Sequence, residues 1–195
     1  SDVVTLITAH KADPSEINID GDYNVTVSGD VSVDQANTIV LDTTGTADFA
    51  GKITDTAANL LNGDAISTKL AAATSGTTGE GDTGVDITVA SGTVSLTQLA
   101  AIHAATTGKI TSDISASAAD LAGGLDTTSG DAITATVTGT SATAARLNTI
   151  NGKTSVVVDA TGVETITGSA SDVVTLITAH KADPSEINID GDYNV

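Results

Sequence analysis

One acidic motif in the sequence has a shape that suits a metal ion. Residues 20–24 read Asp-Gly-Asp-Tyr-Asn, and the same five residues recur at positions 190–194. Carboxylate and amide oxygens arranged around a glycine turn are typical ligands of Ca²⁺. The spacing lacks the glutamate at position 12 of an EF-hand loop, and it lacks the Gly-Gly-x-Gly-x-Asp pattern of calcium β-rolls. The candidate calcium ligands are Asp20, Asp22, Asp190 and Asp192. Solvated turn aspartates are the alternative interpretation.

Other patterns that could support nucleotide binding or catalysis are incomplete. Residues 152–154, Gly-Lys-Thr, resemble the end of a phosphate-binding loop, but Leu147 stands where that motif requires its first glycine. His10 and His180 share one repeat position late in an expected helix, and His103 falls near the corresponding place in another, where the helix dipole favours a cation. The chain has no cysteine and no Gly-x-Ser-x-Gly elbow. The sequence therefore predicts no catalytic residue, no cofactor besides the candidate calcium, and no enzyme activity.

The charge of the chain limits its partners. Seven Lys and Arg against 25 Asp and Glu give a net charge of −18, and the basic residues are scattered singly. Nucleic acid is not an expected partner, because phosphate binding needs clustered basic residues. Dispersed acidity instead keeps a long polymer soluble and attracts divalent cations. No apolar run approaches the roughly 20 residues that span a bilayer, so we expect no membrane insertion by this segment.

The first 25 residues, Ser1 to Val25, recur letter for letter as Ser171 to Val195. Identity at solvated as well as buried positions indicates a tandem array with a period of 170 residues. On this interpretation residues 1–170 are one unit, residues 171–195 begin the next, and the chain is a piece of something longer. The absence of methionine agrees with that expectation. The alternative is an engineered duplication.

Shorter repeats are visible inside the 170-residue unit. Several segments begin with an alternating, β-branched stretch, continue with a helix-like pair of apolar residues three positions apart, and close on a glycine or proline turn. The apolar pairs are Leu99 with Ile102, Leu147 with Ile150, and Val174 with Ile177. Ser95 with Gln98 has the form of a capping box, and Ser117 with Asp120 and Ser169 with Asp172 resemble one. The expected coils are residues 17–52, 53–86, 87–109, 110–132, 133–156 and 157–186.

A repeated strand, short helix and turn predicts parallel strands, because each connection returns the chain to the same edge. The core must be a thin aliphatic layer, since the chain has one Phe, two Tyr and no Trp or Met. We therefore expect an α/β solenoid, β-helix-like, forming one domain over residues 1–195 with short parallel strands on one side and short helices on the other. Residues 17–50 are expected to form one or two helix-free β-coils, and residues 74–86 a loop.

Three segments carry a resemblance to a known class of protein. They are ITDTAANLL at 53–61, LTQLAAIHAATTGKIT at 96–111 and ISASAADLAGGLDTTSGDAIT at 114–134. They resemble repeats in very large bacterial, often cyanobacterial, surface proteins, including adhesin-like and motility-associated cell-envelope polypeptides. The resemblance implies secretion, an extracellular location and a long repetitive architecture. It carries over no active-site residue.

The expected function is structural. The chain would be a segment of a very long extracellular bacterial surface protein, acting as an extended spacer or array. Its expected partners are neighbouring copies of the same repeat, end to end, together with the cell envelope or a glycan. The alternative function is a calcium- or glycan-binding adhesive module on the face of the solenoid.

Overall fold

The computed structural model describes residues 2–13, 15, 19–76, 81–128, 130–182, 186–189 and 191. The chain divides into two compact units. The first comprises Ser1–Gly92 with Ala101–Lys109, and the second comprises Thr93–Ala100 with Ile110–Val195. Among the described residues, no helix combines the length and apolar character needed to cross a membrane.

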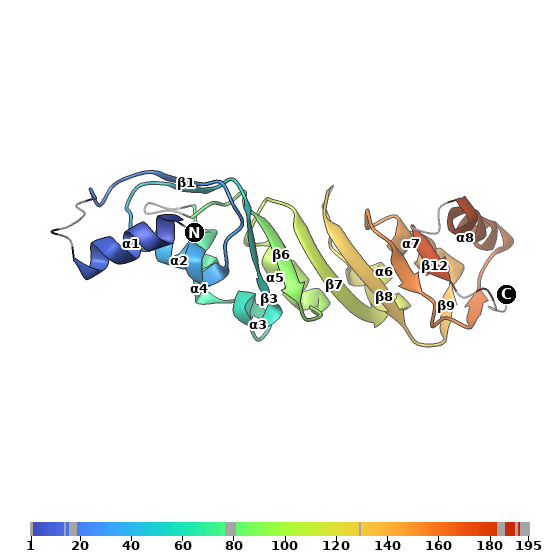
Figure 1. Cartoon of the computed structure of the whole chain (residues 1–195). Helices are drawn as coiled ribbons and strands as arrows, with labels where there is room; N and C mark the ends of the chain where they lie inside the picture. The colour runs from blue at the N-terminus through green and yellow to red at the C-terminus, as the bar shows by residue number, and fades with distance from the viewer. Residues whose placement is uncertain are drawn as a thin grey trace. The chain divides into compact units, whose positions relative to one another are not determined.

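In the first unit, short strands alternate with short helices (Figure 1). Its elements are α1 (Asp2–Ala12), β1 (Val25–Val27), α2 (Val33–Val40), β2 (Ala47–Phe49), β3 (Lys52–Thr56), α3 (Ala57–Leu60), β4 (Leu61–Asn62), β5 (Ala65–Ile66), α4 (Thr68–Ala73) and β6 (Asp86–Ser91). Strand β1 pairs in parallel with β2, and β3 pairs in parallel with β6. Helix α2 packs against both α1 and α4. The antiparallel β4–β5 hairpin lies in the long connection between β3 and β6.

In the second unit, strands pair in parallel with strands from neighbouring parts of the chain (Figure 1). Its elements are β7 (Ile110–Ser117), α6 (Ala118–Gly124), β8 (Ala132–Thr138), β9 (Ser141–Thr143), α7 (Ala144–Asn151), β10 (Val158–Ala160), β11 (Thr165–Thr167), α8 (Ala170–Ala182) and β12 (Ile187–Ile189). The hydrogen-bonded order is β7, β8, β10, β12, with β9 paired to β11. Helices α6, α7 and α8 pack in sequence, each on the next. Helix α5 (Leu96–His103) contains residues of both units.

The strands have one buried side. In β8, Ile133, Ala135 and Val137 are buried while the residues between them are partly exposed, which is the period-two pattern of a half-buried strand. The helices add apolar pairs three residues apart, such as Leu99 with Ile102 and Leu147 with Ile150. The core is therefore aliphatic, and Phe49 is the buried aromatic residue in the described part of the chain.

Serine or threonine begins most of the helices. The capping interactions predicted at Ser95, Ser117 and Ser169 are confirmed, since each hydroxyl oxygen accepts the amide of the residue three positions later at 3.1–3.2 Å. Ser32, Thr56, Ser67 and Thr143 do the same for α2, α3, α4 and α7. A satisfied amide at the first turn is worth about 1 kcal/mol, which helps helices of only 4–8 residues to form.

Two local expectations were wrong. Residues 17–50 are not free of helix, because Val33–Val40 form α2. A full capping box between Ser32 and Gln35 starts this helix, and its buried side carries Val33, Ala36, Ile39 and Val40. The pair Val174 and Ile177 is not the buried side of α8 either, since Val174 is 63% exposed and the buried residue is Leu176.

Candidate functional site

The predicted calcium ligands are only partly within the described structure. Asp20 and Asp22 are both exposed, on either side of Gly21, whose carbonyl accepts the Thr44 amide at 2.8 Å. Asp190 and Asp192 lie outside the described residues. Among the described residues, no three acidic or histidine side chains are gathered as a metal site would need. Calcium binding at Asp20 and Asp22 stays a prediction, which thermal melts in chelator and in millimolar calcium would test.

Asp42, further along the chain, is already engaged. It accepts the Tyr23 hydroxyl at 3.0 Å and pairs with the Lys11 ammonium at 2.9 Å, and its side chain is 7% exposed. Burial, reinforced by the hydrogen bond to Asp42 and by its negative charge, raises the pKa of Tyr23 to about 12. This cluster joins α1, the β1 approach and the end of α2, so its role is structural.

Among the described residues, one polar arrangement recurs after three helices: a turn in which threonine bonds to the backbone at or just before the start of an earlier strand. After α5, the buried Thr106 hydroxyl donates to the Val85 carbonyl at 2.6 Å and accepts the Gly108 amide at 2.9 Å. The next residue, Thr107, donates its amide and its hydroxyl to the Thr83 carbonyl, at 2.8 and 3.1 Å. These acceptors lie just before strand β6, 21 and 24 residues earlier in the chain. We call this arrangement a threonine clasp.

A second threonine clasp follows α2. Thr43 takes the place of Thr106: it donates to the Tyr23 carbonyl and accepts the Gly45 amide at 2.9 Å. Thr44 takes the place of Thr107, since its amide and hydroxyl both reach the Gly21 carbonyl, at 2.8 and 3.3 Å. The two clasps thus match atom for atom.

A third threonine clasp follows α7 in the second unit. Thr154 donates to the Ile133 carbonyl at 2.5 Å, and the Val156 amide donates to its hydroxyl at 3.2 Å. Ser155 donates to the Asp131 carbonyl at 2.7 Å. No role was predicted for these hydroxyls, although Thr-Thr-Gly recurs in the sequence at 43–45 and 106–108, each time starting three positions after the last residue of a helix.

Acidic and amide side chains make a second set of connections, most of them between segments 21–23 residues apart. The Asp86 carboxylate accepts the Lys109 amide at 2.7 Å, and the Asn24 side chain accepts the Thr46 amide at 2.9 Å. Asp131, which is 2% exposed, accepts the Ile110 amide at 2.7 Å and the Thr128 amide at 2.7 Å. A charge-assisted bond of this kind is stronger than a neutral one. Part of the acidity of the chain therefore holds backbone together.

Asp55 shows how such a carboxylate serves two helices at once. It accepts the Val33 amide at the start of α2 at 3.1 Å, the Thr56 amide at 2.9 Å and the Asn59 side chain at 2.6 Å. Burial by itself would raise its pKa, but these hydrogen bonds and the positive charge of Lys69 outweigh burial and hold the pKa of Asp55 below its ordinary value. Its negative charge also suits the N-terminal ends of both helices.

The remaining candidates from the sequence are structural. His10, His103 and His180 all lie in the last turns of helices, as expected from the helix dipole. His180 Nδ1 is 3.0 Å from the Ile187 carbonyl oxygen. In the Gly-Lys-Thr segment, the Lys153 ammonium donates to the carbonyls of Ala122 and Leu125, at 3.0 and 2.9 Å, and thereby caps the end of α6.

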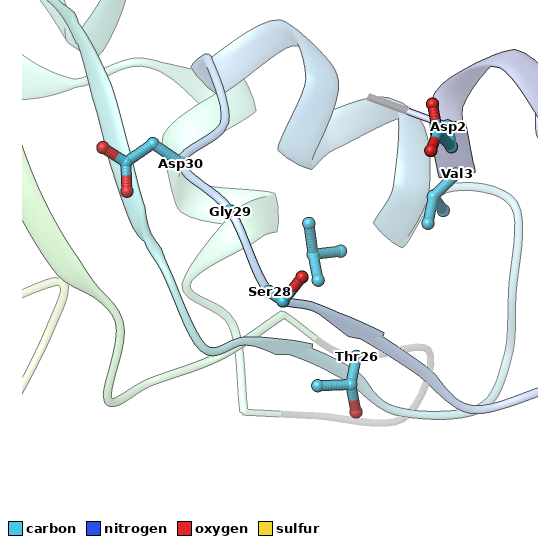
Figure 2. A pocket seen from close by; sticks show the side chains of 7 residues that line it. Asp2, Val3, Thr26, Ser28, Gly29 and Asp30 are labelled. Atoms are coloured by element: carbon cyan, nitrogen blue, oxygen red, sulfur yellow. The ribbon is translucent and has the colours of Figure 1, made fainter.

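One open hollow in the first unit combines hydroxyls and carboxylates. It measures about 310 Å³ and is lined by the start of α1 and by residues 26–30. Figure 2 shows Asp2 and Asp30 on opposite sides of it, with Ser28 between them and Thr26 on the strand below. Asp30 also accepts the Lys52 amide at 3.3 Å. The described residues that line it include no histidine or lysine that could act as a base toward Ser28.

Comparison of the chain with family models, curated proteins and solved structures finds no match.

Proposed function

We propose that this chain is a structural spacer: one 170-residue unit, with the start of the next, of a long extracellular bacterial surface protein built as an α/β solenoid. The observation that supports this most directly is the threonine clasp, which occurs after α2, α5 and α7 and each time bonds to the backbone at or just before the start of an earlier strand, 20 or 21 residues back in the chain. An element that fastens each coil to its neighbour is what a chain of stacked repeats requires.

The energetics of the clasp are consistent with stacked repeats. One neutral hydrogen bond contributes about 0.5–1.5 kcal/mol net. The clasp at Thr106 combines hydrogen bonds from the Thr106 hydroxyl, the Thr107 amide and hydroxyl, and the Gly108 amide, all within one turn. Three of these bonds connect residues 21–24 apart, so they stabilise contacts between neighbouring coils and not the helix itself. Stability in such a protein grows with each interface between neighbours.

The extracellular location is part of the proposal. It is supported by the resemblance of residues 53–61, 96–111 and 114–134 to repeats of giant bacterial surface proteins. The net charge of −18 supports it further, since dispersed acidity keeps a long polymer soluble. The proposed partners are neighbouring copies of the repeat, arranged end to end.

Chains with one, two and three tandem copies would test the proposal. Parallel strands lie about 4.8 Å apart, so six coils should lengthen the particle by roughly 29 Å for each added copy. Small-angle X-ray scattering should show a maximum dimension that rises by this constant step, with the scattering of a rigid rod. Flexibly linked beads, whose dimension grows more slowly than the number of copies, would contradict the proposal.

A further inference from the structure

The two identical terminal helices bury different residues. In α1, Ile7 is 1% exposed and Leu6 is 44% exposed. In α8 the relation is reversed: Leu176, the counterpart of Leu6, is 1% exposed, and Ile177, the counterpart of Ile7, is only partly buried. Val174 is 63% exposed, whereas its counterpart Val4 is half-buried. The two copies are therefore most deeply buried at different residues, Ile7 in one and Leu176 in the other, and Val174 in α8 is left open.

The two sides face different neighbours. Helix α1 packs on α2, and Lys11 forms its ion pair with Asp42 just beyond the end of α2. Helix α8 packs on α7, where the Asn148 amide donates to the Asp172 carbonyl at 3.0 Å. Each neighbour thus belongs to the same unit as the helix it covers.

The two sides are also geometrically separate. With 3.6 residues per turn, Val4, Ile7 and Lys11 lie along one face of the helix, whereas Leu6 and Ala9 lie on roughly the opposite face. A helix with this sequence can therefore contact an α7-like helix on one face and an α2-like helix on the other without a clash between the two neighbours.

We propose that residues 171–182 form a two-sided junction helix between successive copies of the repeat. Its Leu176 face is held by α7 of the preceding copy, and its Val174 and Ile177 face receives the counterpart of α2 from the copy that residues 171–195 begin. The occupant is identified by the chain itself, because α1 has the same sequence and carries α2 on this face. Lys181 would then pair with the counterpart of Asp42, as Lys11 pairs with Asp42. The inference rests on the proposed function, since it requires copies in tandem.

Single cysteines provide the test, because the natural chain has none. Ile177→Cys and Val174→Cys are placed in the 195-residue chain and in an extended chain in which a second copy of residues 26–195 follows Val195. Labelling by a thiol reagent is then timed. In the extended chain we expect the rate at Ile177→Cys to fall at least roughly tenfold, because a fully buried thiol reacts only after local opening. Val174→Cys, at an exposed position, should also be labelled more slowly in the extended chain than in the 195-residue chain.

The first helix supplies matched controls. Leu6→Cys should label quickly in both chains, while Leu176→Cys and Ile7→Cys should label slowly in both. Unchanged rates at Ile177→Cys and Val174→Cys on extension would overturn the junction. Scattering from the same extended chain distinguishes the two proposals: rod-like growth with unprotected thiols overturns only the junction, and flexible beads with protected thiols overturn only the rigid spacer.

Discussion

The threonine clasps after α5 and α7 use the same hydroxyl and differ in one backbone position. In both, the first threonine follows the last helical residue by three positions, accepts the amide two residues on, and donates to a carbonyl 21 residues earlier. The amide comes from Gly108 in the first case and from Val156 in the second. The hydroxyl is therefore common to the clasps, whereas the glycine is not.

Steric crowding by nearby backbone explains why position 108 is a glycine. A Cβ on Gly108 would lie 2.4 Å from the Val85 carbonyl oxygen and 2.5 Å from that of Gly84. The clasp after α2 has the same constraint, because a Cβ on Gly45 would lie 2.3 Å from the Tyr23 carbonyl oxygen. At Val156 the strand approach tolerates a branched side chain. Close backbone approach between coils, and not the turn itself, thus requires glycine.

The largest effect should come from Gly108→Ala. The new methyl group meets backbone atoms that cannot move without disturbing the preceding coil, so we expect a loss of about 3 kcal/mol or more in the free energy of unfolding. Gly152→Ala is the control: φ is −74° and the nearest atom to its Cβ would be 3.5 Å away. That change should be neutral or stabilising by about 0.4–1 kcal/mol. Urea unfolding followed by circular dichroism measures both, and equal losses would refute the steric explanation.

Removing the shared hydroxyl should have the next largest effect. Thr106→Val keeps the shape of the side chain but leaves the buried Val85 carbonyl and Gly108 amide without this partner, which should cost about 1–3 kcal/mol. Thr154→Val should have an effect in the same range. Thr107→Val should cost less, because the Thr107 amide still bonds to the Thr83 carbonyl. Thr106→Ser should restore most of the loss, and a larger effect at Thr107 than at Thr106 would count against the clasp.

Local signals predicted the helices and strands that depend on neighbouring residues. Alternation marked Ile133 to Thr138 as a strand, and the capping boxes marked the helix starts at Ser95, Ser117 and Ser169. Helix α2 was missed because its β-branched Val33, Ile39 and Val40 suggested strands. The Ser32–Gln35 capping box, the same signal as Ser95–Gln98, would have identified it.

Features that depend on distant contacts could not be predicted in this way. Residues 2–12 and 172–182 have one sequence, yet they bury Ile7 in one copy and Leu176 in the other, because different helices cover them. The hydroxyl of Thr106 likewise has a role only because the Val85 carbonyl lies beside it, 21 residues earlier. Distant contacts also distinguish the acidic residues near the candidate calcium site. Asp42 bonds to Tyr23 and Lys11, whereas Asp20 and Asp22 are exposed.

The smallest expected effect is a pH dependence of the clasp at Thr43. Of the three clasps, this is the one whose acceptor is the backbone carbonyl of a tyrosine, Tyr23. The pKa of Tyr23 is raised from 10.0 to about 12 by burial and by Asp42. The neutral phenol therefore contributes stability that is fully present below pH 10 and is lost as the pH rises toward 12. In a Tyr193→Phe variant, phenolate absorbance should report the titration of Tyr23 alone, and Asp42→Asn should move its midpoint back toward 10. Between pH 10 and 12, the melting temperature of the Tyr193→Phe variant should fall more than that of a double variant that carries Tyr193→Phe and Tyr23→Phe. Since Tyr23 is only partly buried, we expect a modest difference, and an equal fall in both variants would show that the phenol does not stabilise this clasp.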